Sequence, residues 1–216
     1  MIRAIYRSIR FQYRRLTIKK VFSTIHDKRL WQGSESVSGS GSGDTTSRNV
    51  RSFLPALLAS VAAQSLLDAP CGDFSWMKDV PLPVKKYYGV DIVKGLIATN
   101  QKWHGTLSRS FVRLDVIRDP LPRTDLILCR HLFIHLPFAD CLRALANFRR
   151  SGARYLLITN QINVAKNEEI LFTGSFRPLN LLLFPFSFSA PITTIPDDSE
   201  GTNLSLFNMT EIDHHC

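Results

Sequence analysis

The sequence predicts an α/β fold: a doubly wound, mostly parallel sheet with an N-terminal helical arm and an irregular C-terminal cap. Helical and strand-like stretches alternate between residues 50 and 160, as in βαβ units that carry helices on both faces of a parallel sheet. Acidic residues close three successive predicted strands at nearly equal spacing, at Asp68, Asp91 and Asp115. With 216 residues, of which 44% are hydrophobic, the chain is long enough for one domain with a sizeable core.

The alternation begins with a helix and a strand. Residues 50–64 (VRSFLPALLASVAAQ) have helical spacing, and residues 65–70 (SLLDAP) form a short apolar strand that ends in a turn. Residues 86–93 (KYYGVDIV) are rich in strand-forming residues. Residues 94–103 (KGLIATNQKW) return to helical spacing, which completes the first repeat of the pattern.

The pattern then continues through a second set of elements. Residues 110–116 (SFVRLDV) and 124–130 (TDLILCR) predict strands. Residues 137–150 (PFADCLRALANFRR) predict a helix that opens on a proline, which the first helical turn tolerates. Residues 153–160 (ARYLLITN) predict a further strand.

The C-terminal region is less regular. Residues 177–196 (RPLNLLLFPFSFSAPITTIP) are apolar but contain several prolines, which excludes a central helix or strand. We therefore expect a packed loop or cap over one end of the sheet. Residues 202–210 (TNLSLFNMT) supply one last strand. The expected division is an arm over residues 1–30 and a domain over residues 31–216.

The arm carries nearly all of the net charge. Residues 1–30 hold nine Lys or Arg against one acid, whereas the remaining residues hold eighteen against seventeen, out of a net charge of +9. Arginines and apolar residues recur along the arm at similar, helical spacings, which predicts a cationic amphipathic helix. The cationic stripe is Arg3, Arg7, Arg10 and Arg14, and the apolar stripe is Ile2, Ile5, Ile9, Tyr13 and Leu16.

Several roles for this arm stay open. In one interpretation the arm covers its own domain or a partner subunit. In a second, ranked equally, residues 1–22 lie on an anionic membrane surface. Nucleic-acid binding and an organelle transit sequence rank below these two. No apolar run is long enough to span a membrane, and no secretory signal is visible. Cys71, Cys129, Cys141 and Cys216 lack paired spacing, which favours reduced thiols. We expect a cytoplasmic protein, peripheral on the inner face of a membrane if the arm binds lipid.

The turn DAPCGD (68–73) suggests a nucleotide site. A glycine there lets the backbone approach a ligand, and an acid about 20 residues further on can accept hydrogen bonds from a ribose diol. The chain has neither the G-x-G-x-x-G pattern nor the G-x-x-x-x-G-K-[ST] pattern that cradles phosphates. A nucleotide without phosphates therefore fits better than a dinucleotide.

In these motifs the chain resembles the class I S-adenosylmethionine-dependent methyltransferases, whose fold is Rossmann-like. LLDAPCGD is similar to their first motif, GVDIV to the second, and RLDV and TDLILCRHLFIHL to the third and fourth. The likeness covers about residues 50 to 160 and is nearest to small bacterial members with a DxPCGDFxW turn. Such members are often associated with surface-polysaccharide genes. The resemblance implies methylation of a hydroxyl on a saccharide or glycolipid-type acceptor.

The resemblance also implies a site for S-adenosylmethionine. The implied residues are Asp68, Ala69, Pro70 and Gly72 at the methionine end, Asp91 and Ile92 at the ribose, Asp115 and Val116 at the adenine, and Cys129 and Arg130 under the sulfonium. Pro70 stands where the family usually has a glycine. Because proline has no N–H, contact there must be apolar or pass through a neighbour.

The Gly/Ser-rich stretch WQGSESVSGSGSG (31–43) is similar to an upstream pattern of the nearer relatives. The resemblance implies a lid over residues 31–47 whose glycines, with Gly41 at their centre, let backbone N–H groups approach the carboxylate of the cofactor. An idle flexible linker is the alternative, because this composition normally behaves as a random coil.

Two histidines follow the fourth strand and are candidates for a general base. We rank His135 ahead of His131, and the alternative for either is a structural histidine. No Glu or Cys completes a zinc site with them, so we expect no metal. Trp76 is a candidate wall of the acceptor pocket. Arg177, inside the apolar cap, needs a partner: an anionic substrate or a carboxylate such as Asp73.

The function that these expectations favour is methyl transfer from S-adenosylmethionine to a small-molecule or glycan acceptor. An RNA methyltransferase is the first rival, with the basic arm as phosphate-binding element. Against it, the rest of the chain carries almost no excess positive charge and shows no aromatic-basic platform for bases. The second rival is a cofactor-binding partner subunit without catalysis.

Overall fold

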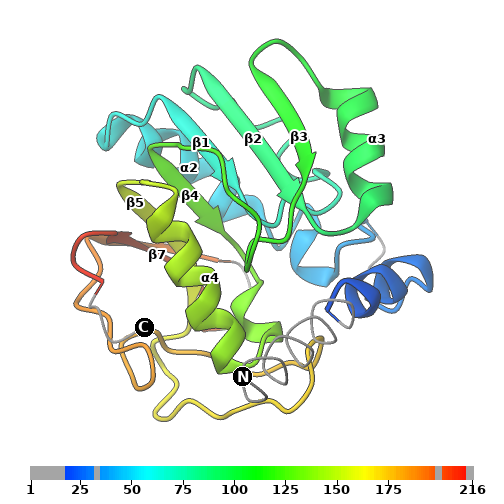
Figure 1. Cartoon of the computed structure of the whole chain (residues 1–216). Coiled ribbons are helices and arrows are strands. Elements are labelled where there is room, and N and C mark those ends of the chain that lie inside the picture. The colour runs from blue at the N-terminus through cyan, green and yellow to red at the C-terminus, as the bar shows by residue number, and fades with distance from the viewer. Residues whose placement is uncertain (1–17, 32–34, 198–200, 213–216) are drawn as a thin grey trace, which may run out of the picture.

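The computed structural model describes residues 18–31, 35–197 and 201–212. Within these residues a seven-stranded sheet, mostly parallel, carries helices on its two faces (Figure 1), which confirms the predicted α/β fold. The strands are β1 (Ser65–Asp68), β2 (Lys86–Asp91), β3 (Arg109–Arg113), β4 (Leu126–Cys129), β5 (Tyr155–Asn160), β6 (Thr193–Pro196) and β7 (Asn203–Asn208). The helices are α2 (Arg48–Ser60), α3 (Lys94–His104) and α4 (Phe138–Arg150), with 3-10 turns η1 (Ser40–Ser42) and η2 (Phe133–His135).

The strand order β3-β2-β1-β4-β5-β7-β6 reverses at β1. On one side β1 pairs in parallel with β2, and on the other with β4. β7 runs antiparallel to both β5 and β6, so β6 runs in the same direction as β5. The carboxyl ends of six strands therefore lie along one edge of the sheet, the edge at which open α/β sheets bind their ligands.

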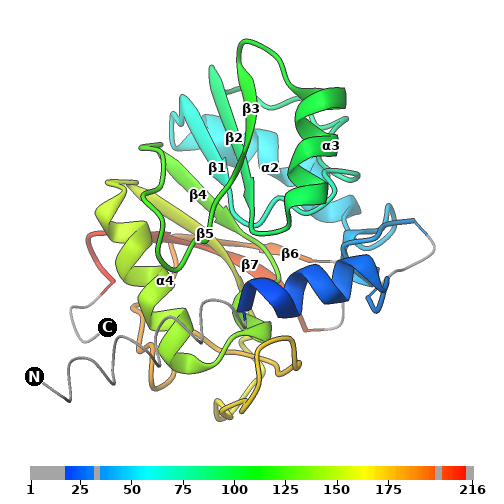
Figure 2. The same cartoon turned by 45° about the vertical axis from the view of Figure 1, so that its right-hand side comes forward.

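Both faces of the sheet are buried, so the middle residues of its central strands are apolar. On one face, Leu66 and Leu128 pack with α2 and α3. On the other, Leu67 and Ile127 pack with α4. Figures 1 and 2 show α2 and α4 on opposite sides of the sheet. Successive residues alternate between these two cores because side chains of a strand point to opposite faces.

The C-terminal region confirms part of the prediction and corrects part. Residues 161–192 form an irregular cap whose apolar residues complete the core next to α4; Leu179, Leu181, Phe186 and Phe188 are buried there. The predicted last strand is β7. The described sheet has no central strand from residues 177–196, as expected, but these residues are not all loop, because Thr193–Pro196 pairs with β7 as an edge strand. A proline cannot donate a hydrogen bond to a neighbouring strand. It is tolerated at the end of an edge strand, because no further strand pairs on its outer side.

The N-terminal segment lies near the carboxyl edge of the sheet. Residues 18–27 are helical, and Ile18 is buried in the same core as Leu132 and Leu136. Figure 2 shows this helix in dark blue beside the end of the sheet where β1, β2 and β4 finish. The predicted cationic stripe, Arg3 to Arg14, lies outside the described residues. In the part of the chain that is described, no helix has the length and apolarity to span a membrane.

Candidate active site

A pocket opens at the carboxyl edge of the parallel strands and brings most of the predicted residues together. Eleven of them line it: Asp68, Pro70, Gly72, Trp76, Asp91, Ile92, Asp115, Val116, Arg130, His131 and His135. The polar members follow the ends of β1, β2, β3 and β4. Parallel pairing thus collects residues from distant parts of the sequence into one site.

Three other predicted residues lie behind the pocket wall. Ala69 and Cys129 are completely buried, and the Ala69 N–H donates to the carbonyl of Leu128. Gly41 packs against the His131 ring, where a β-carbon would lie 2.5 Å from Nδ1 of the imidazole. These residues shape the pocket from outside rather than line it.

Arg177 is also outside the pocket lining. Its side chain is 4% exposed, with the guanidinium 4.4 Å from the Phe138 ring centroid, and Nη2 lies 3.8 Å from Cys141 Sγ. Its Nη1 lies 3.8 Å from a carboxylate oxygen of Glu169. Arg177 thus has a carboxylate of this chain beside it, as one of the two expectations had it, but the carboxylate is that of Glu169 and not that of Asp73.

Asp91 ends β2 with its carboxylate at the pocket. Oδ1 accepts a hydrogen bond from the Val93 N–H at 2.9 Å, and Oδ2 accepts one from the Gly72 N–H at 3.3 Å. Burial raises the pKa of Asp91 to about 6 even though these donors favour the charged form. A ligand that donates further hydrogen bonds to this carboxylate would offset its desolvation.

Asp68 ends β1 and is more strongly perturbed. Burial raises its pKa to about 7, against the opposing effects of Tyr87 and the positive charge of Arg130. The Tyr87 hydroxyl donates to Oδ2 at 2.6 Å. The negative charge of Asp91 adds a further small rise. A buried, partly protonated carboxyl in a pocket is typical of a binding or catalytic site.

Asp115 and its neighbours form a mostly apolar wall of the pocket. Oδ1 of Asp115 accepts a hydrogen bond from the Ile117 N–H at 3.0 Å. Leu114, Val116 and Ile117 line the pocket beside it. This wall combines apolar surface with one carboxylate, an arrangement that suits a flat heterocycle with a polar edge.

His135 is held between aromatic rings. Its ring centroid lies 4.3 Å from that of Trp31, and Nδ1 lies 3.0 Å from the carbonyl oxygen of Ser175. Because a carbonyl only accepts, Nδ1 carries the proton. Burial lowers the pKa of His135 to about 4, so this imidazole is neutral at pH 7.

His131 is fixed by its backbone and its ring. Its φ is 57°, in the left-handed region, and its N–H donates to Thr159 Oγ1 at 2.8 Å. Nε2 lies 3.3 Å from Oδ2 of Asp197. Burial lowers the pKa of His131, and the hydrogen bond to Asp197 opposes the shift.

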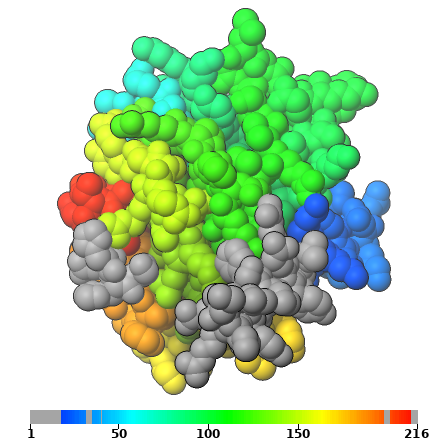
Figure 3. Space-filling model, in the orientation of Figure 1, coloured from blue at the N-terminus to red at the C-terminus, as the bar shows by residue number. Residues whose placement is uncertain are grey.

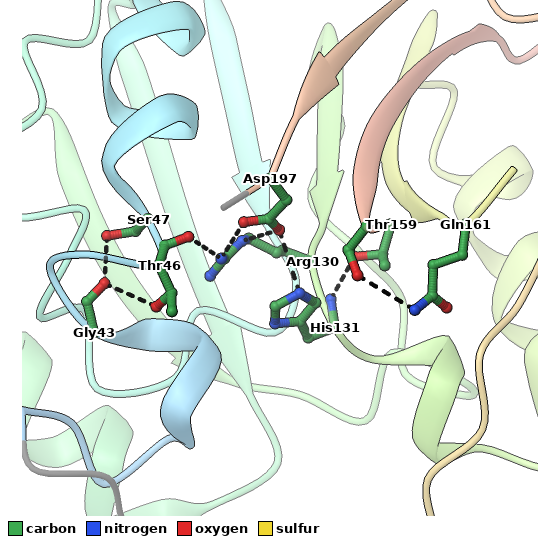
Figure 4. A network of polar contacts seen from close by, with 9 residues as sticks. Gly43, Thr46, Ser47, Arg130, His131, Thr159, Gln161 and Asp197 are labelled. Carbon is green, nitrogen blue, oxygen red and sulfur yellow. Dashed lines mark hydrogen bonds and ion pairs between the residues drawn. The ribbon is translucent and has the colours of Figure 1, made fainter. Parts of the chain in front are cut away.

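Arg130 and Asp197 form a buried ion pair beside His131 (Figure 4). Arg130 donates through Nε at 3.0 Å and Nη2 at 2.7 Å to the two oxygens of Asp197. Nη2 also lies 3.3 Å from the carbonyl oxygen of Thr46. Although burial opposes ionisation, the hydrogen bonds from His131 and Arg130 hold the pKa of Asp197 below its usual range.

The Gly/Ser-rich segment packs on the turn after β1. Ser36 Oγ and the Val37 N–H both donate to Oδ2 of Asp73, at 2.7 and 3.0 Å. The Asp73 N–H in turn donates to Ser38 Oγ at 2.8 Å. Gly72 is required at this contact, because a β-carbon there would lie 2.7 Å from Ser38 Oγ. The Gly/Ser-rich segment thus makes polar contacts with the turn after β1 at Ser36, Val37 and Ser38.

Sequence reasoning missed two contributions to the pocket. The first is the N-terminal segment, which lines it through Ile18, Phe22, Ile25, His26 and Trp31. Figure 3 shows this segment in blue at the surface, against the green part of the chain. The second is Asp197, which directly follows β6 and, without lining the pocket itself, holds the lining residues Arg130 and His131. Its signal was an acid after a strand, as at Asp68 and Asp91, but that strand had not been recognised.

The sheet order and the place of the pocket define the fold of the class I S-adenosylmethionine-dependent methyltransferases. No family model and no curated protein sequence matches the chain, so the likeness is one of structure.

Three solved structures illustrate the likeness. Human N-acetylserotonin methyltransferase, in complex with S-adenosylmethionine, has a TM-score of 0.61 at 14% identity, over 87% of this chain and 58% of that one. Magnesium protoporphyrin IX methyltransferase from Synechocystis PCC 6803, with bound S-adenosylhomocysteine, gives 0.57 at 12% identity over 89% and 98%. The pyocyanin biosynthetic protein PhzM gives 0.57 at 16% identity over 74% and 54%. The chain thus spans little more than half of two of these relatives, and identities this low establish the shared fold.

The contact between Gly41 and His131 predicts the effect of adding one methyl group. In Gly41→Ala the new β-carbon would lie 2.5 Å from the imidazole, so the segment or the ring must shift. We expect faster hydrogen exchange of amides 36–44 and a loss of about 1–3 kcal/mol in the free energy of unfolding. Gly95→Ala is the control, because its β-carbon meets His26 at an ordinary 3.5 Å. Equal exchange in both variants would contradict this close packing.

The raised pKa of Asp68 predicts a pH-dependent stability of the ligand-free protein. A carboxyl whose pKa is higher in the folded than in the unfolded state stabilises the fold below about pH 4, and this contribution is lost as the pH rises to about 7. Asp68→Asn keeps an acceptor for Tyr87 and removes the charge. Denaturant unfolding at pH 8 should show the variant more stable than the unsubstituted chain by about 1–4 kcal/mol, with the difference vanishing near pH 4. A variant that is less stable at both pH values would exclude a buried charge at Asp68.

Proposed function

We propose that this chain is an S-adenosylmethionine-dependent methyltransferase. The observation that carries the proposal is that three strand-end carboxylates, Asp68, Asp91 and Asp115, line one pocket together with two histidines. The fold binds its ligands at this edge of the sheet. Two of the structural relatives were solved with S-adenosylmethionine or S-adenosylhomocysteine bound, and their fold is shared by this chain.

The residues of the pocket fit this cofactor. Asp91 offers desolvated carboxylate oxygens to a ribose diol, a pairing in which each hydroxyl donates a charge-assisted hydrogen bond. The wall at Asp115 suits the adenine ring. Asp68 and Gly72 face the remaining end, where the ammonium group of the methionine moiety would offset the buried charge of Asp68.

The residues of the chain have three tasks in such a reaction. When bound, the cofactor supplies a methyl group on a sulfonium, which leaves as a neutral thioether. Residues of the N-terminal segment cover the pocket and reduce its contact with water. Trp31 and Trp76 line the pocket and would limit the orientations that an acceptor can take there. A neutral histidine at the pocket can take the proton that the acceptor loses.

We propose a hydroxyl of a saccharide or glycolipid-type molecule as the acceptor. A hydroxyl needs a base, and both pocket histidines have lowered pKa values and are therefore uncharged at neutral pH. Tryptophan faces suit the apolar faces of sugar rings. The saccharide itself rests on the sequence resemblance. A test uses S-adenosylmethionine labelled in its methyl group with pools of nucleotide sugars, lipid-linked saccharides and RNA. Label in RNA alone would contradict the saccharide, and cofactor binding without transfer to any pool would favour a partner subunit without catalysis.

The role of Asp91 predicts a loss of cofactor affinity. Asp91→Ala removes a carboxylate that would accept two hydrogen bonds worth roughly 1.5–3 kcal/mol each, so calorimetry should show at least tenfold weaker binding of S-adenosylhomocysteine. In the unsubstituted chain the affinity should fall as the pH falls through about 6, because Asp91 becomes protonated. The exposed Asp79→Ala is the matched control for a lost charge. Equal affinities in the two variants would exclude Asp91 from the site.

We also propose that the basic arm binds an anionic membrane surface. Residues 18–22 pack at the pocket, so a test must leave them in place. Replacing Arg3, Arg7, Arg10 and Arg14 by Gln should abolish binding to vesicles that contain an anionic phospholipid, while Lys78→Gln with Lys85→Gln should not. Binding of the unsubstituted chain should weaken as salt rises from about 50 to 500 mM. Salt-independent binding would contradict an electrostatic role.

A further inference from the structure

We propose that His131 is the general base of this site and that Asp197 is the positioning residue that holds its imidazole. In this arrangement Asp197 fixes the proton on Nε2, and Nδ1 takes the proton of the acceptor. The inference rests on the proposed methyl transfer. Neither the role of Asp197 nor the choice of ring nitrogen follows from the sequence.

The first support is the contact between the two side chains. Asp197 follows β6 directly, and its carboxylate is completely buried. Oδ2 lies 3.3 Å from Nε2 of His131 (Figure 4). An ionised carboxylate can only accept a hydrogen bond, so Nε2 must donate and Nδ1 must carry the lone pair.

The second support is that Arg130 keeps Asp197 ionised and oriented. Its two hydrogen bonds, to Oδ1 and Oδ2, fix the plane of the carboxylate. The charge of Asp197 is therefore compensated within the fold before any ligand binds. An imidazolium formed at His131 would face a carboxylate that is already in place, which is the electrostatic condition for an efficient base.

The third support is the placement of the ring. The His131 backbone lies in the left-handed region, where a non-glycine residue is uncommon, and the Thr159 hydroxyl accepts its N–H. Gly41 stands on the side of Nδ1, where a β-carbon would lie 2.5 Å from this nitrogen. A glycine at this position therefore keeps the space beside Nδ1 free of a side chain, while Asp197 holds the opposite side of the ring.

His135 is less suited to the same role. Its Nδ1–H donates to the carbonyl oxygen of Ser175, which leaves the lone pair on Nε2, and its ring packs on Trp31. Its pKa of about 4 makes it a weak base. This reverses the ranking expected from the sequence. The titratable and charged groups identified around His131 are Arg130 after β4, Asp197 after β6 and His135 in η2.

The chemical step balances as follows for a hydroxyl acceptor. The acceptor oxygen forms a bond to the methyl carbon while the carbon–sulfur bond breaks and leaves its electron pair on sulfur. The hydroxyl proton moves to Nδ1 of His131. The resulting imidazolium is stabilised by Asp197 and later releases its proton to water.

The direct test is nitrogen NMR of the His131 ring in the full chain without ligand. We expect the tautomer with the proton on Nε2. Asp197→Asn should increase the share of the other tautomer and lower the pKa of His131, because the carboxylate that favours the charged ring is gone. Glu169→Gln, which removes the carboxylate near Arg177, should leave both unchanged. A proton on Nδ1 in the unsubstituted chain would overturn the proposal, and that measurement does not depend on the folding of any variant.

A double-mutant cycle separates positioning from structure, with the acceptor found in the transfer assay. His131→Gln should lower kcat about 10²–10⁴-fold with little effect on cofactor affinity, and Asp197→Asn should lower kcat at least tenfold. In the His131→Gln background, Asp197→Asn should cost less than about twofold. Fully additive losses would make Asp197 merely structural. If methyl transfer survives His131→Gln, His131 is not the base, but the chain is still a methyltransferase. If the chain shows the expected tautomer but binds no cofactor, the proposed function itself is contradicted.

Discussion

The site depends on the parallel pairing of β1 with β2 on one side and with β4 on the other. This pairing brings the carboxyl ends of strands that are far apart in the sequence to a single edge. The interiors of these short strands are largely apolar, and β1 and β2 each end on an aspartate. Burial of both faces therefore drives the polar residues to the same place.

The aspartates gathered there have different charge states because their partners differ. Asp68 and Asp91 lie in the pocket with neutral donors, and burial raises the pKa of both. Asp197 is buried as well, but a guanidinium with two aligned donors keeps it ionised. The first two are thus suited to bind a ligand that brings donors or a positive charge. The third is satisfied internally and is suited to orient a neighbouring side chain.

Much of the fold was predictable, because alternation of helix and strand over residues 50–160 depends on local spacing. β6 was not, since its proline and its position in an apolar stretch resemble a loop, and its pairing with β7 is visible only in three dimensions. Asp197 was missed with it. The partner of Arg177 could not be predicted either. The sequence contains several acids, among them Glu169 and Asp73, and does not show which of them folds next to the guanidinium. The contribution of Trp31 to the pocket depends on how the N-terminal segment docks.

The docking of the N-terminal segment has a consequence for the order in which the protein can assemble during synthesis. Trp31 packs on His135, and Val21 and Ile25 lie beside Gly174 in the cap. The segment that lines the pocket is therefore synthesised well before the residues on which it docks. Contacts of such high sequence separation form slowly. Until they form, Ile18, Phe22 and Trp31 lack their native burial, and a nascent or truncated chain would expose them to chaperones or to other chains.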